Sequence, residues 1–78
     1  MGDSEEVVMR YAVVIERADS NYSAYVPDLP GCVAAGATVK ETENGIREAI
    51  EFHIRDMKED GLPVPSPSSA VEYIEVAA

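Results

Sequence analysis

The strongest constraint on the fold is a long amphipathic segment that begins at Thr38 and ends before Gly61. Its first residues, TVKE, form a capping box, in which the Thr38 hydroxyl and the Glu41 carboxylate bind free N–H groups at a helix start. Apolar side chains then recur at helical spacing, and glycine is common just past a helix end. We therefore predict a single helix from Val39 to about Asp60. The predicted inward stripe is Val39, Thr42, Ile46, Ala49, Ile50, His53 and Met57.

Three strands are predicted before this helix. The run Val7–Arg17 is rich in β-branched residues and is apolar on both faces, which favours a central strand. A turn over 19–21 leads to a second strand, Tyr22–Val26, which ends because Pro27 cannot donate to a β-ladder. After a stiff loop with a type II turn, a short third strand, Cys32–Ala35, is expected to return antiparallel.

The chain after the helix is predicted to contribute an arm and a last strand. Three alternating prolines over 62–67 favour an extended segment that crosses back over the domain. Val71–Val76 reads as a strand, in which Glu72 and Glu75 suit an exposed edge. The order is β-β-β-α-β, an α/β (α+β) fold with a three-stranded antiparallel meander, one helix and a final strand parallel to the first. The first strand then lies between the second and the fourth.

A chain of 78 residues forms one domain with a small core. We expect a disordered tail over 1–6 and a single domain over 7–78, with no separate DNA-binding domain. Cys32 is the only cysteine, so no disulfide staples the fold. Small domains without staples gain stability by association, which predicts a homodimer or tetramer. The sheet face opposite the helix needs cover, and Ala12, Val14 and Tyr25 are expected to lie on it.

The chain carries fifteen acidic and six basic residues, a formal charge of −9. Such a surface repels phosphates, so direct binding of nucleic acid is not expected. The charge is consistent either with simple solubility or with a basic protein partner. The acidic N-terminus does not resemble a secretory signal, the apolar runs are too short to span a bilayer, and one cysteine suits a reducing compartment. We expect a cytoplasmic protein without membrane contact.

No residue pattern predicts catalysis, a cofactor or a metal. Metal-dependent nucleases need several converging carboxylates, whereas Glu16, Asp28 and Glu41 are scattered over a strand end, a loop and a helix. His53 falls on the apolar helix stripe and is interpreted as structural. Cys32 has no basic neighbour in sequence and is interpreted as a buried, inert thiol. The chain is therefore not expected to be an enzyme.

Several motifs together resemble the HicB-like antitoxin family. They are the octapeptide YVPDLPGC from Tyr25 to Cys32, the residues Gly36 and Thr38 before the helix, Glu48-Ala49-Ile50 within it, and the Gly-Leu-Pro that begins at Gly61. The resemblance implies a partial RNase H-like fold. It also implies a partner, a HicA-type toxin, which is a small basic ribonuclease that cleaves mRNA. Many members carry a C-terminal DNA-binding domain, which this sequence lacks, so direct autorepression is not expected.

The resemblance thus implies an antitoxin that neutralises a HicA-type toxin by occluding it. The alternative is an orphan, a homo-oligomeric scaffold or small-ligand-binding protein without a toxin partner. A degenerate nuclease is the third hypothesis. The loop Pro27–Gly31 reads equally as a stiff turn and as a preformed contact surface. The residues predicted to contact a partner are Tyr25, Asp28, Leu29 and Phe52.

Overall fold

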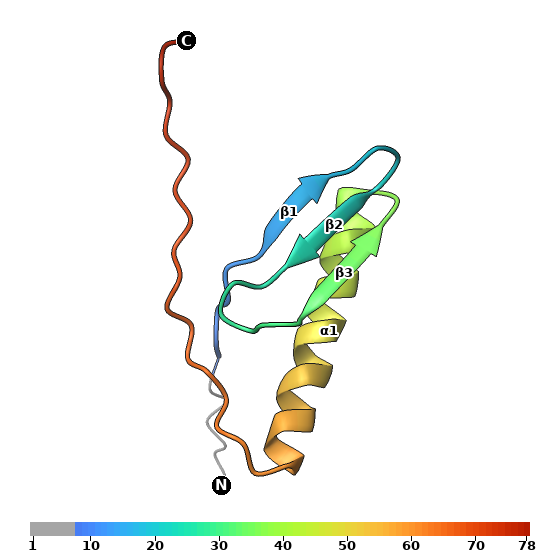
Figure 1. Cartoon of the computed structure of the whole chain (residues 1–78), viewed down its shortest axis with the longest axis vertical. Helices are drawn as coiled ribbons and strands as arrows, with labels where there is room; N and C mark the ends of the chain where they lie inside the picture. Colours follow the sequence, from blue (N-terminus) through green and yellow to red (C-terminus); the bar gives the residue numbers. More distant parts are fainter. Residues whose placement is uncertain (1–7) are drawn as a thin grey trace, which may run out of the picture.

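The computed structural model describes residues 8–78, so the predicted tail over 1–6 and the first residue of the predicted first strand lie outside it. A three-stranded antiparallel sheet packs one face against a single long helix (Figure 1). The elements are β1 (Val14–Arg17), β2 (Tyr22–Tyr25), β3 (Val33–Gly36) and α1 (Val39–Glu59). The predicted α+β class and the order of these four elements are confirmed. No helix within 8–78 is both long and apolar enough to cross a membrane.

The sheet order is β1-β2-β3, and the register aligns two rows of side chains. Ile15, Ala24 and Ala34 are cross-strand partners, and Ala24 is buried on the face toward the helix. Val14, Tyr25 and Val33 form the adjacent row, which points to the opposite face because side chains alternate along a strand. Val14 and Tyr25 therefore lie on the face without a helix, as predicted.

The first strand differs from its prediction in length and in position. It was expected to run over Val7–Arg17 and to be central, whereas β1 begins only at Val14 and lies at an edge. The expected fourth strand, Val71–Val76, is the reason. Within 8–78 this segment pairs with no strand, so the outer edge of β1 and the chain leading into it have no ladder partner. The prediction of a parallel fourth strand is not realised in the single chain.

Both ends of α1 follow from local chemistry. The N–H of Glu41 donates to Thr38 Oγ1 over 3.0 Å, and the Glu41 carboxylate accepts from the N–H of Ala37 over 3.1 Å, one residue earlier than a standard capping box. At the other end Gly61 has φ 72°, and its N–H donates to the carbonyl of Lys58. The N–H of Leu62 donates to the carbonyl of Met57, which completes a Schellman motif.

The helix is much longer than the sheet beneath it. Its 21 residues extend about 31 Å, whereas a four-residue strand extends about 13 Å. Part of the helix therefore extends past the strands (Figure 1). Val39, predicted to face inward, is 42% exposed, and Ile54, left out of the predicted stripe, is half-buried.

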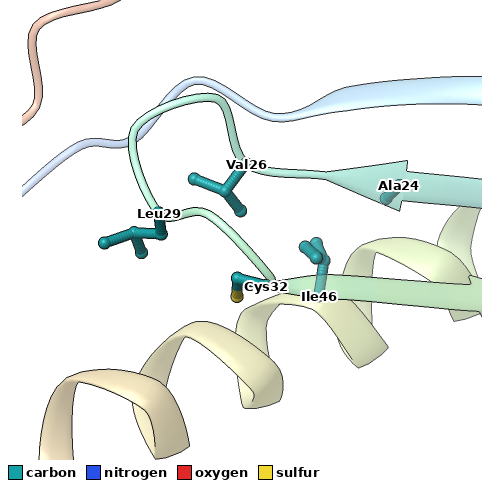
Figure 2. Packing of buried hydrophobic residues seen from close by; sticks show 5 residues of the cluster. All are labelled: Ala24, Val26, Leu29, Cys32 and Ile46. Atoms are coloured by element: carbon teal, nitrogen blue, oxygen red, sulfur yellow. The ribbon is translucent and has the colours of Figure 1, made fainter. Parts of the chain in front are cut away.

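The core is small and includes the loop between β2 and β3. Its buried apolar members are Ala24, Val26, Leu29, Cys32 and Ile46 (Figure 2). Three of them belong to the loop or its flanks, so the loop closes one end of the core. Gly36 allows β3 to approach the helix start, because a Cβ there would lie 2.8 Å from the hydroxyl oxygen of the fully buried Thr42.

After α1 the chain turns back and passes the loop before it leaves the domain. The segment 70–78, which we call the C-terminal arm, runs as an extended strand-like trace away from the sheet (Figure 1). The molecule measures 53 × 27 × 24 Å, and its radius of gyration of 15.1 Å exceeds the roughly 11–12 Å of a compact chain of this length. The elongation comes from the arm.

Candidate protein-binding surfaces

The loop between β2 and β3 is a pair of tight turns. The N–H of Leu29 donates to the carbonyl of Val26, and the N–H of Cys32 donates to the carbonyl of Leu29, both over 3.1 Å. A third bond, from the N–H of Val26 to the carbonyl of Cys32 over 3.2 Å, closes the loop. Gly31 has φ 85°, as the third position of the predicted type II turn requires. The loop backbone is therefore held by three hydrogen bonds of its own.

Asp28 clamps the chain that follows the helix onto this loop. Its Oδ2 accepts the N–H groups of Ser68 and Ser69 over 2.9 and 3.0 Å, and its Oδ1 accepts their hydroxyls over 3.1 and 2.8 Å. These bonds, led by the one from the Ser68 N–H, lower the pKa of Asp28 to about 2. We call these three residues the Asp28 clamp.

Tyr11 supports the same attachment from the chain before β1. Its hydroxyl donates to the carbonyl of Pro65, next to the clamp. Burial, together with the nearby negative charge of Asp28, raises the pKa of Tyr11. The hydroxyl therefore stays protonated at neutral pH and keeps its role as a donor. The returning segment is thus bound at two successive places.

An exposed apolar surface surrounds the β3 edge. Tyr25 is 43% exposed on the open sheet face, beside its cross-strand partner Val33, which is 64% exposed. Val33 also lines a groove of about 440 Å³ between β3 and α1, and Phe52, 65% exposed, lies on the helix side of that groove. We call these three residues the β3-edge surface. Glu48, which lines the same groove, places a carboxylate at its border.

The structure distributes the four predicted contact residues over three environments. Tyr25 and Phe52 belong to the β3-edge surface, Asp28 belongs to the clamp, and Leu29 is buried in the core at 1% exposure. Val33, which joins Tyr25 to Phe52, was not singled out in the sequence, because its strand position became clear only from the register. Nothing in the sequence indicated that Ser68 and Ser69 bind Asp28, which lies about forty residues earlier.

The arrangement offers little for catalysis. Cys32 and His53 line the same groove, but burial raises the pKa of the Cys32 thiol, so it is protonated and a weak nucleophile at neutral pH. Within 8–78 no three potential ligands among His, Cys, Asp and Glu come together where a metal ion could bind.

Comparison with known proteins gives the family. The family model described as a HicB_like antitoxin of bacterial toxin–antitoxin systems matches residues 11–77. The chain belongs to the HicB-like antitoxin family. The resemblance found in the sequence is therefore confirmed, and it covers all the elements described above, including the arm.

Two relatives differ in how much of their own length matches this chain. A 14.9 kDa protein from the rep-hol intergenic region of Haemophilus phage HP1 is 41% identical over 66 residues, which are 85% of this chain and 50% of the relative. The chain thus spans about half the length of that relative. A UPF0150 protein of Helicobacter pylori is 40% identical over 65 residues, which are 82% of this chain and 90% of the relative.

A solved structure is similar to the HicB-like domain in shape. It is a chain from a HicA3 and HicB3 toxin–antitoxin complex, with a TM-score of 0.67 and 32% sequence identity. The match covers 77% of this chain and 70% of that one. The family model of an antitoxin and a structural neighbour from a toxin–antitoxin complex thus agree in the class of protein that they indicate.

Proposed function

We propose that this chain binds a small basic HicA-type ribonuclease toxin and neutralises it by occlusion, without any catalytic activity of its own. The observation that carries the proposal is the match to the HicB-like family over 11–77. The likeness to a chain of the HicA3–HicB3 complex supports the class of partner. The net charge of −9 is complementary to a basic protein, and the proposed place of action is the cytoplasm, where mRNA is cleaved.

The β3-edge surface is the proposed contact site. Binding energy in protein interfaces concentrates in a few buried aromatic and apolar side chains at the centre. Tyr25 on the open sheet face and Phe52 on the helix side of the groove provide two exposed aromatic rings, and Glu48 supplies a rim carboxylate. Leu29 and Asp28 contribute indirectly, because one anchors the loop in the core and the other holds the returning chain.

Substitution of Phe52 tests this assignment. Because Phe52 is 65% exposed, Phe52→Asp should leave the unfolding temperature nearly unchanged. It should raise the Kd for the toxin about thirtyfold, the effect of losing a contact worth about 2 kcal/mol. Isothermal titration with the cognate toxin measures the Kd. Val39→Asp is the control: it also replaces an apolar helix residue with aspartate, at a position 42% exposed and outside the groove, and should bind normally.

An RNA protection assay tests the function itself. Labelled RNA should be cleaved by the toxin, protected when this chain is added in equimolar amount, and left intact by this chain alone with magnesium or manganese. The orphan alternative predicts that no HicA-type toxin is bound and no RNA is protected. Cleavage by the chain alone that Glu16→Gln abolishes would instead support the nuclease hypothesis.

A further inference from the structure

The C-terminal arm exposes more apolar side chain than any other part of the described chain. Val71, Tyr73, Ile74 and Val76 are 50, 94, 80 and 78% exposed. Glu72 and Glu75 are three residues apart, so in an extended chain they face opposite sides, and each side of the arm carries two apolar residues and one carboxylate. Such a segment is suited to adding as a strand to a sheet edge, with one side against an apolar surface.

A groove that suits such a strand lies beside β1. It has a volume of about 960 Å³ and is open to solvent between α1 and the chain that leads into β1. Val13 and Ile15 form its sheet wall, and Ile46, Ile50 and Ile54, spaced four residues apart along the helix, form its floor. The adjoining edge of β1 has no strand partner within 8–78. Apolar packing and free backbone groups are therefore available side by side.

The charges of the arm and the groove are complementary. Arg10, Arg47 and Lys58, half of the six basic residues of the chain, line this groove. The arm carries two glutamates and no basic residue. Glu43 and Glu51 also line the groove, so its charge is mixed, with the three cations exceeding the two carboxylates. An incoming acidic strand would find cations on both the chain that leads into β1 and the helix.

The Asp28 clamp fixes the base of the arm on the loop, and the arm reaches the border of its own groove without being seated in it. Ser68 and Ser69 are bound to the loop, and alternating prolines stiffen the approach to them. Beyond the clamp, the arm leads outward (Figure 1), and Tyr73 borders the groove while remaining 94% exposed. We propose that the arm of one copy inserts into the β1 groove of a second copy, and that the exchange is reciprocal in a homodimer.

A reciprocal exchange covers the exposed arm, the open groove and the free edge of β1 of both copies in one symmetric assembly. Each copy has one arm and one groove, so a twofold dimer uses both and leaves neither open. The exchange covers the apolar residues of the arm and removes the free edge of β1, which otherwise is a site for uncontrolled strand pairing. It also places a fourth strand beside β1, where the sequence alone predicted it, but from the other chain.

Point variants of the arm test whether it forms the interface. Sedimentation equilibrium of the full chain at micromolar concentration should give twice the 8.4 kDa monomer mass. Ile74→Asp should raise the dimer dissociation constant at least about tenfold, since it forces a charge into an apolar groove. Val39→Asp, a matched change outside the groove, should leave it unaltered. A monomeric wild type, or a dimer indifferent to Ile74→Asp, would overturn the proposal.

A charge exchange between two chains separates insertion between copies from closure onto the same chain. A variant with Glu72→Lys and Glu75→Lys has a basic arm and a basic groove, and one with Arg10→Glu and Arg47→Glu has an acidic arm and an acidic groove. Each alone should be mostly monomeric, and an equimolar mixture should form heterodimers, because every arm then meets a groove of opposite charge. Monomers that persist in the mixture would contradict reciprocal exchange.

Amide hydrogen exchange gives a second readout. Protection of residues 71–76 should increase with protein concentration if the arm binds another copy. Protection that is independent of concentration would show that the arm closes onto its own chain. Toxin binding through the β3-edge surface should survive Ile74→Asp, so failure of the dimer and failure of the proposed function are distinguishable.

Discussion

At the scale of single residues, two adjacent positions in the loop between β2 and β3 have different roles. Leu29 and Asp28 are adjacent in the proline-rich loop, yet one is buried in the core and the other binds four donors on the returning chain. The loop therefore joins the core to the base of the C-terminal arm. A substitution at Asp28 should act on the path of the arm and leave the core intact.

The Asp28 clamp should make stability depend on pH in a defined window. The folded pKa is lowered from 3.8 to about 2, so the contribution of the clamp is fully present above the unfolded value near 4 and is lost as pH falls toward 2. The unfolding temperature should therefore drop between pH 4 and 2 more in the wild type than in Asp28→Asn. Thermal unfolding by circular dichroism from pH 2 to 6 measures this difference.

Glu16→Gln is the matched control for that series, since it removes one carboxylate that lies outside the clamp. Its profile should follow the wild type. In Asp28→Asn, amide exchange at Ser68 and Ser69 should also be faster at neutral pH, because both N–H groups lose their charged acceptor. Identical pH profiles for the wild type and Asp28→Asn would show that the clamp does not contribute to stability.

At the scale of elements, the helix is specified by its ends and supported by only part of its length. Its caps are local hydrogen bonds, and its N-terminal half, which holds the buried Thr42 and Ile46, packs on the sheet. Helix residues between 45 and 53 line the groove beside β3, and helix residues between 43 and 58 line the groove beside β1. The helix thus forms one wall of both candidate interaction surfaces.

Two glycine substitutions on this helix should have opposite signs. Gly61→Ala should destabilise the protein by about 1 kcal/mol, because φ 72° is unfavourable for a residue with a Cβ. Gly45→Ala should stabilise it by about 0.5–1 kcal/mol, because alanine favours a helix interior and the new Cβ would contact Ala34 at an ordinary 3.5 Å. Urea unfolding measures both. Equal signs would contradict this account of the C-cap.

At the scale of the whole molecule, an elongated acidic chain presents different surfaces to different partners. The β3-edge surface is proposed for a basic toxin, and the groove beside β1 is proposed for the arm of a second copy. The two lie at opposite edges of the sheet, so a dimer could bind a toxin on each copy. The net charge of −9 then acts mainly on encounter with the toxin.

This role of the net charge in the encounter predicts how toxin binding responds to salt. The association rate should fall as ionic strength rises, because the Debye length shrinks from about 10 Å at 0.1 M to about 3 Å at 1 M. The dissociation rate should change much less, since it reports the desolvated centre of the interface. Stopped-flow measurements across a salt series determine both rates. An association rate indifferent to salt would remove electrostatic steering from the proposed function.

Local features of this protein could be predicted from its sequence. The capping box at Thr38, the helix end at Gly61, the turn at Gly31 and the three strands before the helix agree with the structure to within a few residues, apart from the start of β1. They agree because each depends on hydrogen bonds and backbone preferences within a few positions of the chain. The family resemblance rested on the same local motifs.

The tertiary structure determined which distant residues these local features contact. It buried Leu29, joined Asp28 to Ser68 and Ser69, and set Val33 between two aromatic residues. It also left β1 at an edge, because a strand exists only where a partner supplies its ladder. The pattern over 71–76 encodes a strand-forming segment by itself, but the place where it pairs depends on contacts between distant parts of the fold, which local preferences do not specify.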